Sequence, residues 1–299
     1  MTHILGVSSP RAGHHLFEAI LRGVVGQNYK YCETYSLNEC CKNVPCNAQE
    51  SQKWIAEGVF FQKSHDFYFA DPLFVKGTFR LIQLRDPIPR AFSDYSLYLK
   101  NSKLPDNENT FRTLLEYEAA YFIQFYRKWV LLRTTPAFVL HYERLVDEPV
   151  IVMKEFLNFC GLEVDRATIQ ETVRRVMGTV VDTPVSYVPR DVYSHKHANS
   201  QYCSQYEAVV FKYCVDYPGK RFFSTSTPTS ESDMTPFEHA VLAYCTLNQG
   251  GKERETLKHA QTARDAHPDD FELNKLVRNA QIIWDRLQLH SANSQDQVS

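Results

Sequence analysis

Residues 2–26, THILGVSSPRAGHHLFEAILRGVVG, decide the fold that this sequence predicts. The apolar run Ile4–Val7 is typical of a strand, and the stretch Leu16–Val25 has the spacing of an amphipathic helix that Gly26 can end. Between them lies SSPRAGHHL, residues 8–16, a turn with a single glycine. Proteins build phosphate cradles in this order of strand, glycine-containing turn and helix. The turn lacks the Gly-Lys-Ser/Thr of nucleotide triphosphatases.

Outward from this stretch, strand-like and helix-like patterns alternate up to about residue 223. This alternation predicts an α/β fold with a central, mainly parallel sheet flanked by helices. The predicted strands are Ile4–Val7, Val59–Gln62, Phe79–Leu84 and Phe138–Tyr142. The predicted helices include Leu16–Val25, Thr110–Leu132, one that Asp147 caps and Gly161 ends, and Ala167–Met177.

The composition changes after residue 223. Residues 224–236 are rich in Ser, Thr and Pro and are predicted to be a linker. Residues 237–288 carry three helical patterns and resemble a tetratricopeptide-type hairpin, and residues 289–299 are predicted to be a disordered tail. One hairpin cannot bury its own apolar face, so we expect this small helical appendage to contact the main domain, residues 1–223, or a partner protein.

Charge and composition exclude several classes of protein. The 299 residues carry a formal net charge of −2, which gives no reason to expect nucleic-acid or membrane binding. No long apolar stretch and no signal peptide is evident, so we expect a cytoplasmic protein with its eight cysteines as thiols. Cys32, Cys40, Cys41 and Cys46 lie close together, but their irregular spacing favours structural thiols over a metal site or disulfides.

The turn after the first predicted strand has the chemistry of an anion site. The N–H groups of Gly13, His14, His15 and Leu16 would open a helix without intrahelical partners and could point at a phosphate. Arg11 adds a permanent cation with several donors. The alternative is a tight turn with a surface arginine and two solvated histidines.

Two further motifs follow predicted strands. Arg85 comes at the end of one strand and Ser93 lies eight residues later on a helix, so together they could hold one phosphate. Lys63 and His65 follow another strand, and histidine is the side chain best suited to general-base catalysis near neutral pH. Taken separately, these motifs are also compatible with an ion pair and a polar turn.

Together and in this order, the three motifs resemble the sulfotransferase family, which transfers a sulfuryl group from 3′-phosphoadenosine 5′-phosphosulfate (PAPS). In cytosolic members the first loop looks like Tyr-Pro-Lys-Ser-Gly-Thr-Thr, where this chain has Ser-Pro-Arg-Ala-Gly-His-His. The block Tyr142–Asp165 is similar to the family's Tyr-Glu-x-Leu, Asp-Pro and Gly-Leu segment. The resemblance implies a P-loop NTPase-like sulfotransferase fold over about residues 2–220.

The resemblance also implies roles for individual residues. His65, Lys63 and Arg11 would be catalytic, with His65 as the base that takes a proton from the acceptor. The residues expected to bind PAPS or its product, 3′-phosphoadenosine 5′-phosphate (PAP), are Arg11, Ala12, Gly13, His14, His15, Leu16, Arg85, Ser93, Arg190 and Lys196. Arg190 and Lys196 stand where the family has its closing Arg-Lys-Gly element. The scheme needs no metal.

The expected partners are therefore the nucleotide co-substrate and an acceptor with a hydroxyl or amine. General resemblance to bacterial sulfotransferases favours a carbohydrate, and residues 29–57 and 95–109 are candidates to line its site. Two alternatives stay open: a P-loop kinase or nucleotide-binding protein, and a non-catalytic module with a degenerate transferase fold. The kinase needs a Lys-Ser/Thr that the loop lacks.

Overall fold

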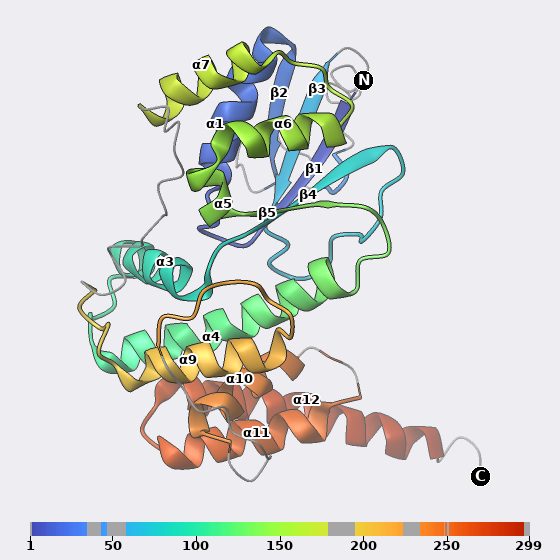
Figure 1. The fold of residues 1–299 in the computed structure, drawn as a ribbon. Coiled ribbons are helices and arrows are strands. Elements are labelled where there is room, and N and C mark those ends of the chain that lie inside the picture. Colours follow the sequence, from blue (N-terminus) through green and yellow to red (C-terminus); the bar gives the residue numbers. More distant parts are fainter. Residues whose placement is uncertain are drawn as a thin grey trace. The chain divides into compact units, whose positions relative to one another are not determined.

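A computed structural model describes residues 2–34, 43–46, 58–178, 195–223, 234–247, 249 and 251–295 (Figure 1). The chain forms two compact units. The first comprises Met1–Asp94 and Phe125–Asp191, and the second comprises Tyr95–Gln124 and Val192–Ser299. The second unit includes the predicted C-terminal appendage.

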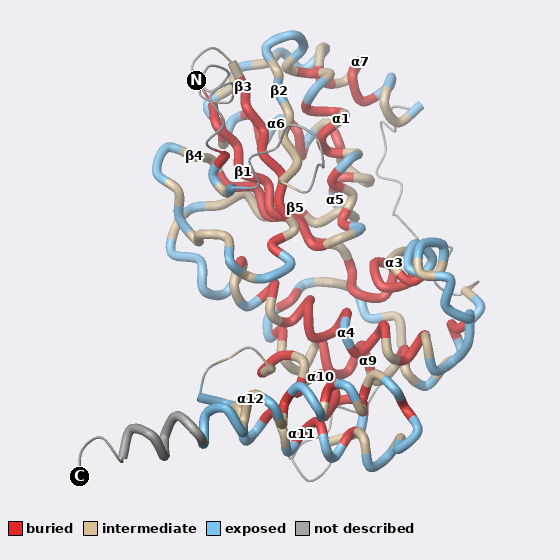
Figure 2. Tube along the Cα trace, turned by 180° about the vertical axis from the view of Figure 1, so that it is seen from behind, coloured by how far each residue is buried: buried red, intermediate tan, exposed pale blue. Residues whose placement is uncertain are grey.

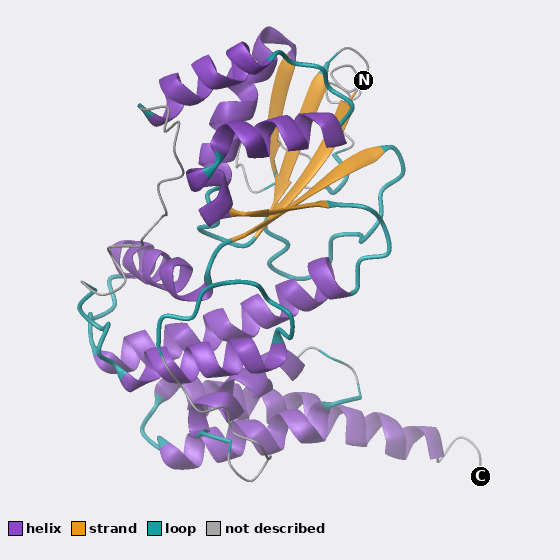
Figure 3. Ribbon diagram, viewed as in Figure 1, coloured by secondary structure: helices purple, strands orange, loops and turns teal. Residues whose placement is uncertain are grey.

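The first unit contains a five-stranded sheet in the order β2-β3-β1-β4-β5, with every strand pair parallel (Figure 3). Its strands are β1 (Thr2–Ser8), β2 (Tyr29–Glu33), β3 (Val59–Ser64), β4 (Thr78–Leu84) and β5 (Phe138–His141). All seven residues of β1 are buried, as expected for a central strand covered on both faces (Figure 2). The predicted α/β fold with a parallel sheet flanked by helices is confirmed.

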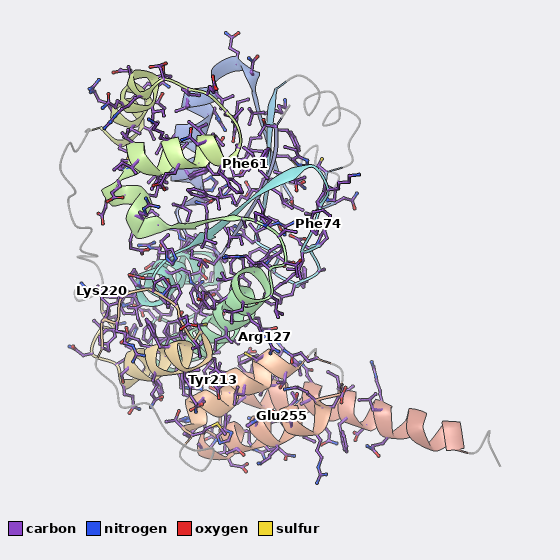
Figure 4. The ribbon with its side chains drawn as sticks, turned by 45° about the vertical axis from the view of Figure 1, so that its right-hand side comes forward. Phe61, Phe74, Arg127, Tyr213, Lys220 and Glu255 are labelled. Carbon is purple, nitrogen blue, oxygen red and sulfur yellow. The ribbon has the colours of Figure 1, made fainter. Side chains whose placement is uncertain are left out.

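Helices from the N-terminal and the C-terminal segments of the first unit pack on this sheet. They are α1 (His14–Val25), α5 (Tyr142–Asp147), α6 (Pro149–Phe159) and α7 (Arg166–Met177). Their apolar side chains share one core with the strands, in which Phe17 of α1 meets Phe156 of α6 edge to face at 4.9 Å. Phe61 of β3 belongs to the same core and is labelled in Figure 4.

The second unit is helical in its described residues. Its helices are α9 (Gln201–Tyr213), α10 (Pro236–Thr246), α11 (Glu253–Ala266) and α12 (Phe271–Gln295), together with most of α4 (Glu108–Tyr126). α3 (Pro87–Ser102) begins in the first unit and ends in the second. Buried alanines and leucines of α10, α11 and α12 form a core of their own, since small side chains let helices approach closely.

Several elements differ from the sequence-based predictions. β2 was not predicted, because an edge strand reading Tyr-Lys-Tyr-Cys-Glu lacks a continuous apolar run. The predicted helix over residues 110–132 is α4 followed by a short π-helical turn, Arg127–Leu131. α12 continues to Gln295, past residue 288, because neither Gly nor Pro interrupts it. Most of the predicted linker, residues 224–233, and residues 296–299 of the predicted tail lie outside the described residues.

Candidate functional site

The order of the strands decides where a ligand can bind in the first unit. β1 lies between β3 and β4, so the chain leaves β1 toward one side of the sheet and later returns to its other side. In parallel α/β sheets, ligands bind outside the carboxyl ends of the strands at this reversal. The segments that start there are residues 9–13 after β1, His65 after β3 and Arg85 after β4. These are the three predicted motifs.

The loop after β1 has the geometry of an anion cradle. Gly13 is the N-cap of α1 and has a left-handed backbone with φ 76°. Its carbonyl accepts the first intrahelical bonds, from the N–H groups of Leu16 and Phe17. The N–H groups of Gly13, His14 and His15 therefore precede the helical ladder at the positive end of its dipole.

Two of the predicted cradle residues use their backbone N–H groups for hydrogen bonds within the loop and the first turn of α1. The N–H of Ala12 donates to the carbonyl of Ser9 at 3.2 Å, and that of Leu16 donates to Gly13 at 3.1 Å. The expectation that the Leu16 N–H has no intrahelical partner is wrong, because α1 begins at His14, two residues earlier than predicted. The Ala12 side chain is buried and helps to fix the turn.

His14 and His15 differ in their surroundings. His14 is buried, stacks on Phe61 at 5.2 Å, and its Nδ1 lies 2.9 Å from Gln83 Oε1. Its Nε2 lies 3.3 Å from the hydroxyl of Tyr31. Burial, helped by the charge of Lys63, lowers the pKa of His14 well below its usual range. Both ring nitrogens of His14 therefore meet protein partners, whereas His15 is exposed.

His65 is held in one orientation. Its Nδ1 lies 2.7 Å from the backbone carbonyl of Ser8 and 3.2 Å from the Ser8 hydroxyl. Since a carbonyl only accepts hydrogen bonds, Nδ1 carries the hydrogen and Nε2 is the basic nitrogen. Burial and the nearby charge of Lys63 lower the pKa of His65 to about 4. The imidazole is therefore neutral at pH 7.

Lys63 has a partner that the sequence analysis missed. Its ammonium is almost fully buried and lies 2.5 Å from a carboxylate oxygen of Glu33, the last residue of β2. Burial acts to raise the pKa of Glu33, but the hydrogen bond and charge of Lys63 outweigh it, so this pKa lies below its usual value. The sequence could have placed Glu33 at the carboxyl edge of the sheet only if β2 had been recognised as a strand.

Arg85 and Ser93, which were predicted to hold one phosphate together, are linked through Arg11. The Arg11 Nε donates to the Ser93 hydroxyl at 2.9 Å, and the Arg85 Nη1 donates to the Arg11 carbonyl at 3.2 Å. The backbone of Arg11 lies in the left-handed region, with φ 61°. The structure thus brings together Arg11, Arg85 and Ser93, which are up to 82 residues apart in the chain.

Tyr142 supports both parts of this arrangement. The guanidinium of Arg85 lies 4.7 Å from the centre of its ring, and a Cβ on Gly13 would come within 2.1 Å of its Cδ2. The next residue, Glu143, accepts from the N–H of Asp86 at 3.0 Å, and burial raises the pKa of Glu143 to about 7. The block that begins at Tyr142 therefore contacts the candidate site.

The last two predicted nucleotide ligands are not tested by these contacts. Arg190 lies outside the described residues. Lys196 belongs to the second unit, where its ammonium pairs with Asp106 at 3.0 Å. Cys40 and Cys41 are also outside the described residues, whereas Cys46 is buried and its N–H donates to Gln62.

The site thus offers two kinds of chemistry. Backbone N–H groups at a helix N-terminus and two guanidinium groups can bind anions. A neutral histidine with its basic nitrogen set by a hydrogen bond can accept a proton. Among the described residues, no three His, Cys, Asp or Glu side chains gather as a metal site would require, and no helix there is long and apolar enough to cross a bilayer.

Comparison with known proteins gives likenesses among solved structures. No family model and no curated protein matches the chain. Among solved structures, the chain is similar to mouse sulfotransferase SULT7A1 complexed with PAP, with 20% identity over 62% of this chain and 69% of that chain and a TM-score of 0.48. The α/β assignment itself rests on the strand pairing described above.

Proposed function

We propose that this protein is a PAPS-dependent sulfotransferase that transfers a sulfuryl group to a hydroxyl or amine. One observation carries the proposal: the cradle at Gly13, the Arg11–Ser93 and Arg85 contacts, and the oriented His65 occur together at the switch point of a parallel sheet. Gly13 fits an anion there, because only a residue without Cβ avoids Tyr142 and keeps the loop backbone accessible.

In the proposed reaction, the basic Nε2 of His65 takes the proton of the acceptor O–H or N–H. The acceptor atom then forms a bond to sulfur while the bond between sulfur and the phosphate oxygen breaks, and PAP leaves with the electron pair. Sulfuryl transfer resembles phosphoryl transfer in that positioning and charge stabilisation supply most of the catalysis. Arg11 and Lys63 are the cations proposed for the bridging oxygen and the sulfuryl oxygens, and Arg85 and Ser93 are proposed for the 3′-phosphate.

The acceptor is proposed to bind beside the loop that follows His65. Phe67 lies 5.2 Å from the His65 ring, and Tyr68 and Phe74 of this loop are largely exposed, with Phe74 labelled in Figure 4. Exposed aromatic rings next to a base suit an acceptor with a ring, whether a sugar or an arene. Lys196, Arg190 and His15 keep their proposed roles in nucleotide binding.

Isothermal titration calorimetry tests the nucleotide. We expect the wild-type protein to bind PAP without metal, and more tightly than adenosine 5′-phosphate, which lacks the 3′-phosphate. Arg85→Ala should remove most of that preference. Tighter binding of ATP with Mg²⁺ would favour a kinase, and no nucleotide binding would favour a non-catalytic module.

Turnover of labelled PAPS over a panel of sugars, phenols and amines tests the base. His65→Ala should lower turnover by about 10²–10⁴-fold, the usual contribution of general-base catalysis, with PAP affinity near that of the wild type. His267→Ala, which removes a histidine of the second unit, is the control and should keep full turnover. Full turnover in His65→Ala would contradict the assignment of the base.

A further inference from the structure

The ion pair between Glu33 and Lys63 is fixed by the sheet itself. The two residues are register partners on the adjacent parallel strands β2 and β3, so their side chains leave the sheet side by side. The chain beyond β2 is tied to the same point, because the N–H and the hydroxyl of Thr34 both donate to the Lys63 carbonyl, at 3.1 and 2.7 Å. The 2.5 Å pair therefore belongs to the architecture of the site edge.

The two partners differ in their access to water. The Lys63 side chain is 3% exposed, whereas that of Glu33 is 28% exposed. A ligand that approaches this edge therefore meets the carboxylate before it can reach the ammonium. The charge of Glu33 also acts on the two histidines of the site edge, His15 and His65. The carboxylate thus lies among the groups proposed to bind and transfer an anion.

We propose that Glu33 sets the affinity for the anionic nucleotide by competing with it for Lys63. The proposal rests on the proposed function, which places the phosphosulfate at the N-terminus of α1 and Lys63 next to the bridging oxygen, the oxygen that stays on the 5′-phosphate of PAP. One ammonium cannot pair fully with both anions, and two negative groups close together repel each other. Each binding event must therefore weaken the Glu33–Lys63 pair.

The competition has a consequence for turnover. The product PAP keeps its phosphates, so a site built only of cations and N–H donors would hold it tightly. When PAP leaves, Glu33 pairs fully with Lys63 again, and this pairing lowers the affinity for the product. Product release limits the turnover rate of many enzymes. Glu33 is in this sense a positioning residue that acts through Lys63.

The experiment is a double-mutant cycle on the Kd of PAP, measured by calorimetry. Glu33→Gln should bind PAP about tenfold more tightly than the wild type, and Lys63→Met should bind it more weakly. In the Lys63→Met background, Glu33→Gln should have almost no effect, because the competition needs the ammonium. A purely structural role of Glu33 would instead weaken binding in both backgrounds.

Two further variants keep the test decisive. Glu18→Gln removes a carboxylate that pairs with Arg22 on α1 and should leave the Kd unchanged. Glu33→Asp keeps a charge beside Lys63 but shortens its reach, so it should bind PAP about threefold more tightly even if Glu33→Gln fails to fold. Equal or weaker binding by the folded Glu33 variants would overturn the proposal.

Inorganic pyrophosphate, titrated in parallel, separates this inference from the proposed function. If the wild type binds no PAP but Glu33→Gln gains affinity for pyrophosphate, the competition for Lys63 stands and the sulfotransferase proposal falls. If PAP binds and neither anion distinguishes Glu33→Gln from the wild type, the sulfotransferase proposal stands and the competition falls.

Discussion

Gly13 is the residue whose backbone allows the cradle to form. Its φ of 76° lies in the left-handed region, and a Cβ there would stand 2.1 Å from Tyr142 Cδ2. We expect Gly13→Ala to weaken PAP binding by at least about tenfold and to lower the free energy of unfolding by about 1–3 kcal/mol, as measured by calorimetry and urea unfolding.

A second glycine distinguishes backbone strain from the contact with Tyr142 as the cause of weaker PAP binding. Gly178, at the end of α7, has a similar φ of 78°, but a Cβ on it would meet nothing within 4 Å. Gly178→Ala should therefore show the backbone strain alone and leave PAP affinity unchanged. A similar loss of PAP affinity in both variants would argue against the contact with Tyr142 as the cause.

The protonation of His65 predicts the pH dependence of the reaction. Burial and Lys63 lower the pKa of His65 to about 4, and only the neutral ring can accept a proton. The contribution of His65 to kcat/KM should therefore be constant above about pH 5 and fall as the pH drops through 4. A profile measured with labelled PAPS that instead fell below pH 6.5 would indicate an unperturbed histidine.

At the scale of elements, the loop between β3 and β4 is anchored directly behind His65. The buried carboxylate of Asp66 accepts from Lys128 Nζ at 2.6 Å, from Trp129 Nε1 at 3.0 Å and from the N–H of Asp71 at 2.9 Å. Lys128 and Trp129 lie in the π-helical turn after α4, so this turn fixes the residue next to the proposed base.

Asp66→Asn tests this anchor. The side-chain amide of asparagine is uncharged and cannot form an ion pair with Lys128, and its NH2 group would face other hydrogen-bond donors. We therefore expect the free energy of unfolding to fall by about 3 kcal/mol. Because His65 would lose its support, kcat should fall more than PAP affinity does. Lys76→Gln, an exposed change in the same loop, should alter neither; unchanged stability and kcat in Asp66→Asn would refute the anchor.

At the scale of the whole molecule, a buried cluster of ionisable side chains joins distant parts of the second unit. Arg112 of α4 pairs with Glu116 on the same helix and with Asp270, which lies 158 residues later, just before α12. Burial raises the pKa of Glu116 to about 8, and the charge of Asp270 adds to this rise against the opposing effect of Arg112.

The sign of this shift predicts how stability depends on pH. Between the ordinary pKa of 4.5 and about 8, the folded chain binds more protons at Glu116 than the unfolded chain. The contribution of Glu116 to stability is therefore complete below pH 4.5 and is lost as the pH rises through 8. Between pH 6 and 9, the free energy of unfolding of the wild type should therefore fall by roughly 3 kcal/mol more than that of Glu116→Gln, as measured by urea unfolding.

Glu255→Gln provides the comparison for that measurement. Glu255 is half-exposed on α11 and is labelled in Figure 4, so its neutralisation should leave the pH dependence of the wild type intact. A wild-type stability that does not change between pH 6 and 9 would contradict the buried, protonated state of Glu116.

Local sequence by itself determined the fold class and the edge at which the site lies. Apolar runs such as Ile4–Val7 and Phe79–Leu84 predict buried parallel strands, and the carboxyl ends of such strands must meet at one edge. Arg11, His65 and Arg85 each follow such a strand directly, so their approximate location follows from the order of the chain. The edge strand β2 has no such run, and Glu33 was missed with it.

Only the tertiary structure decided the chemical state of these residues. The hydrogen bond that fixes the His65 tautomer joins residues 57 apart, the Lys63–Glu33 pair joins residues 30 apart, and the contact that buries His14 against Gln83 joins residues 69 apart. Periodicity and local propensity describe neighbours within a few residues and say nothing about such partners. Burial, pKa and hydrogen-bond direction depend on which distant groups the packed sheet brings within 3 Å, and so they follow from the fold.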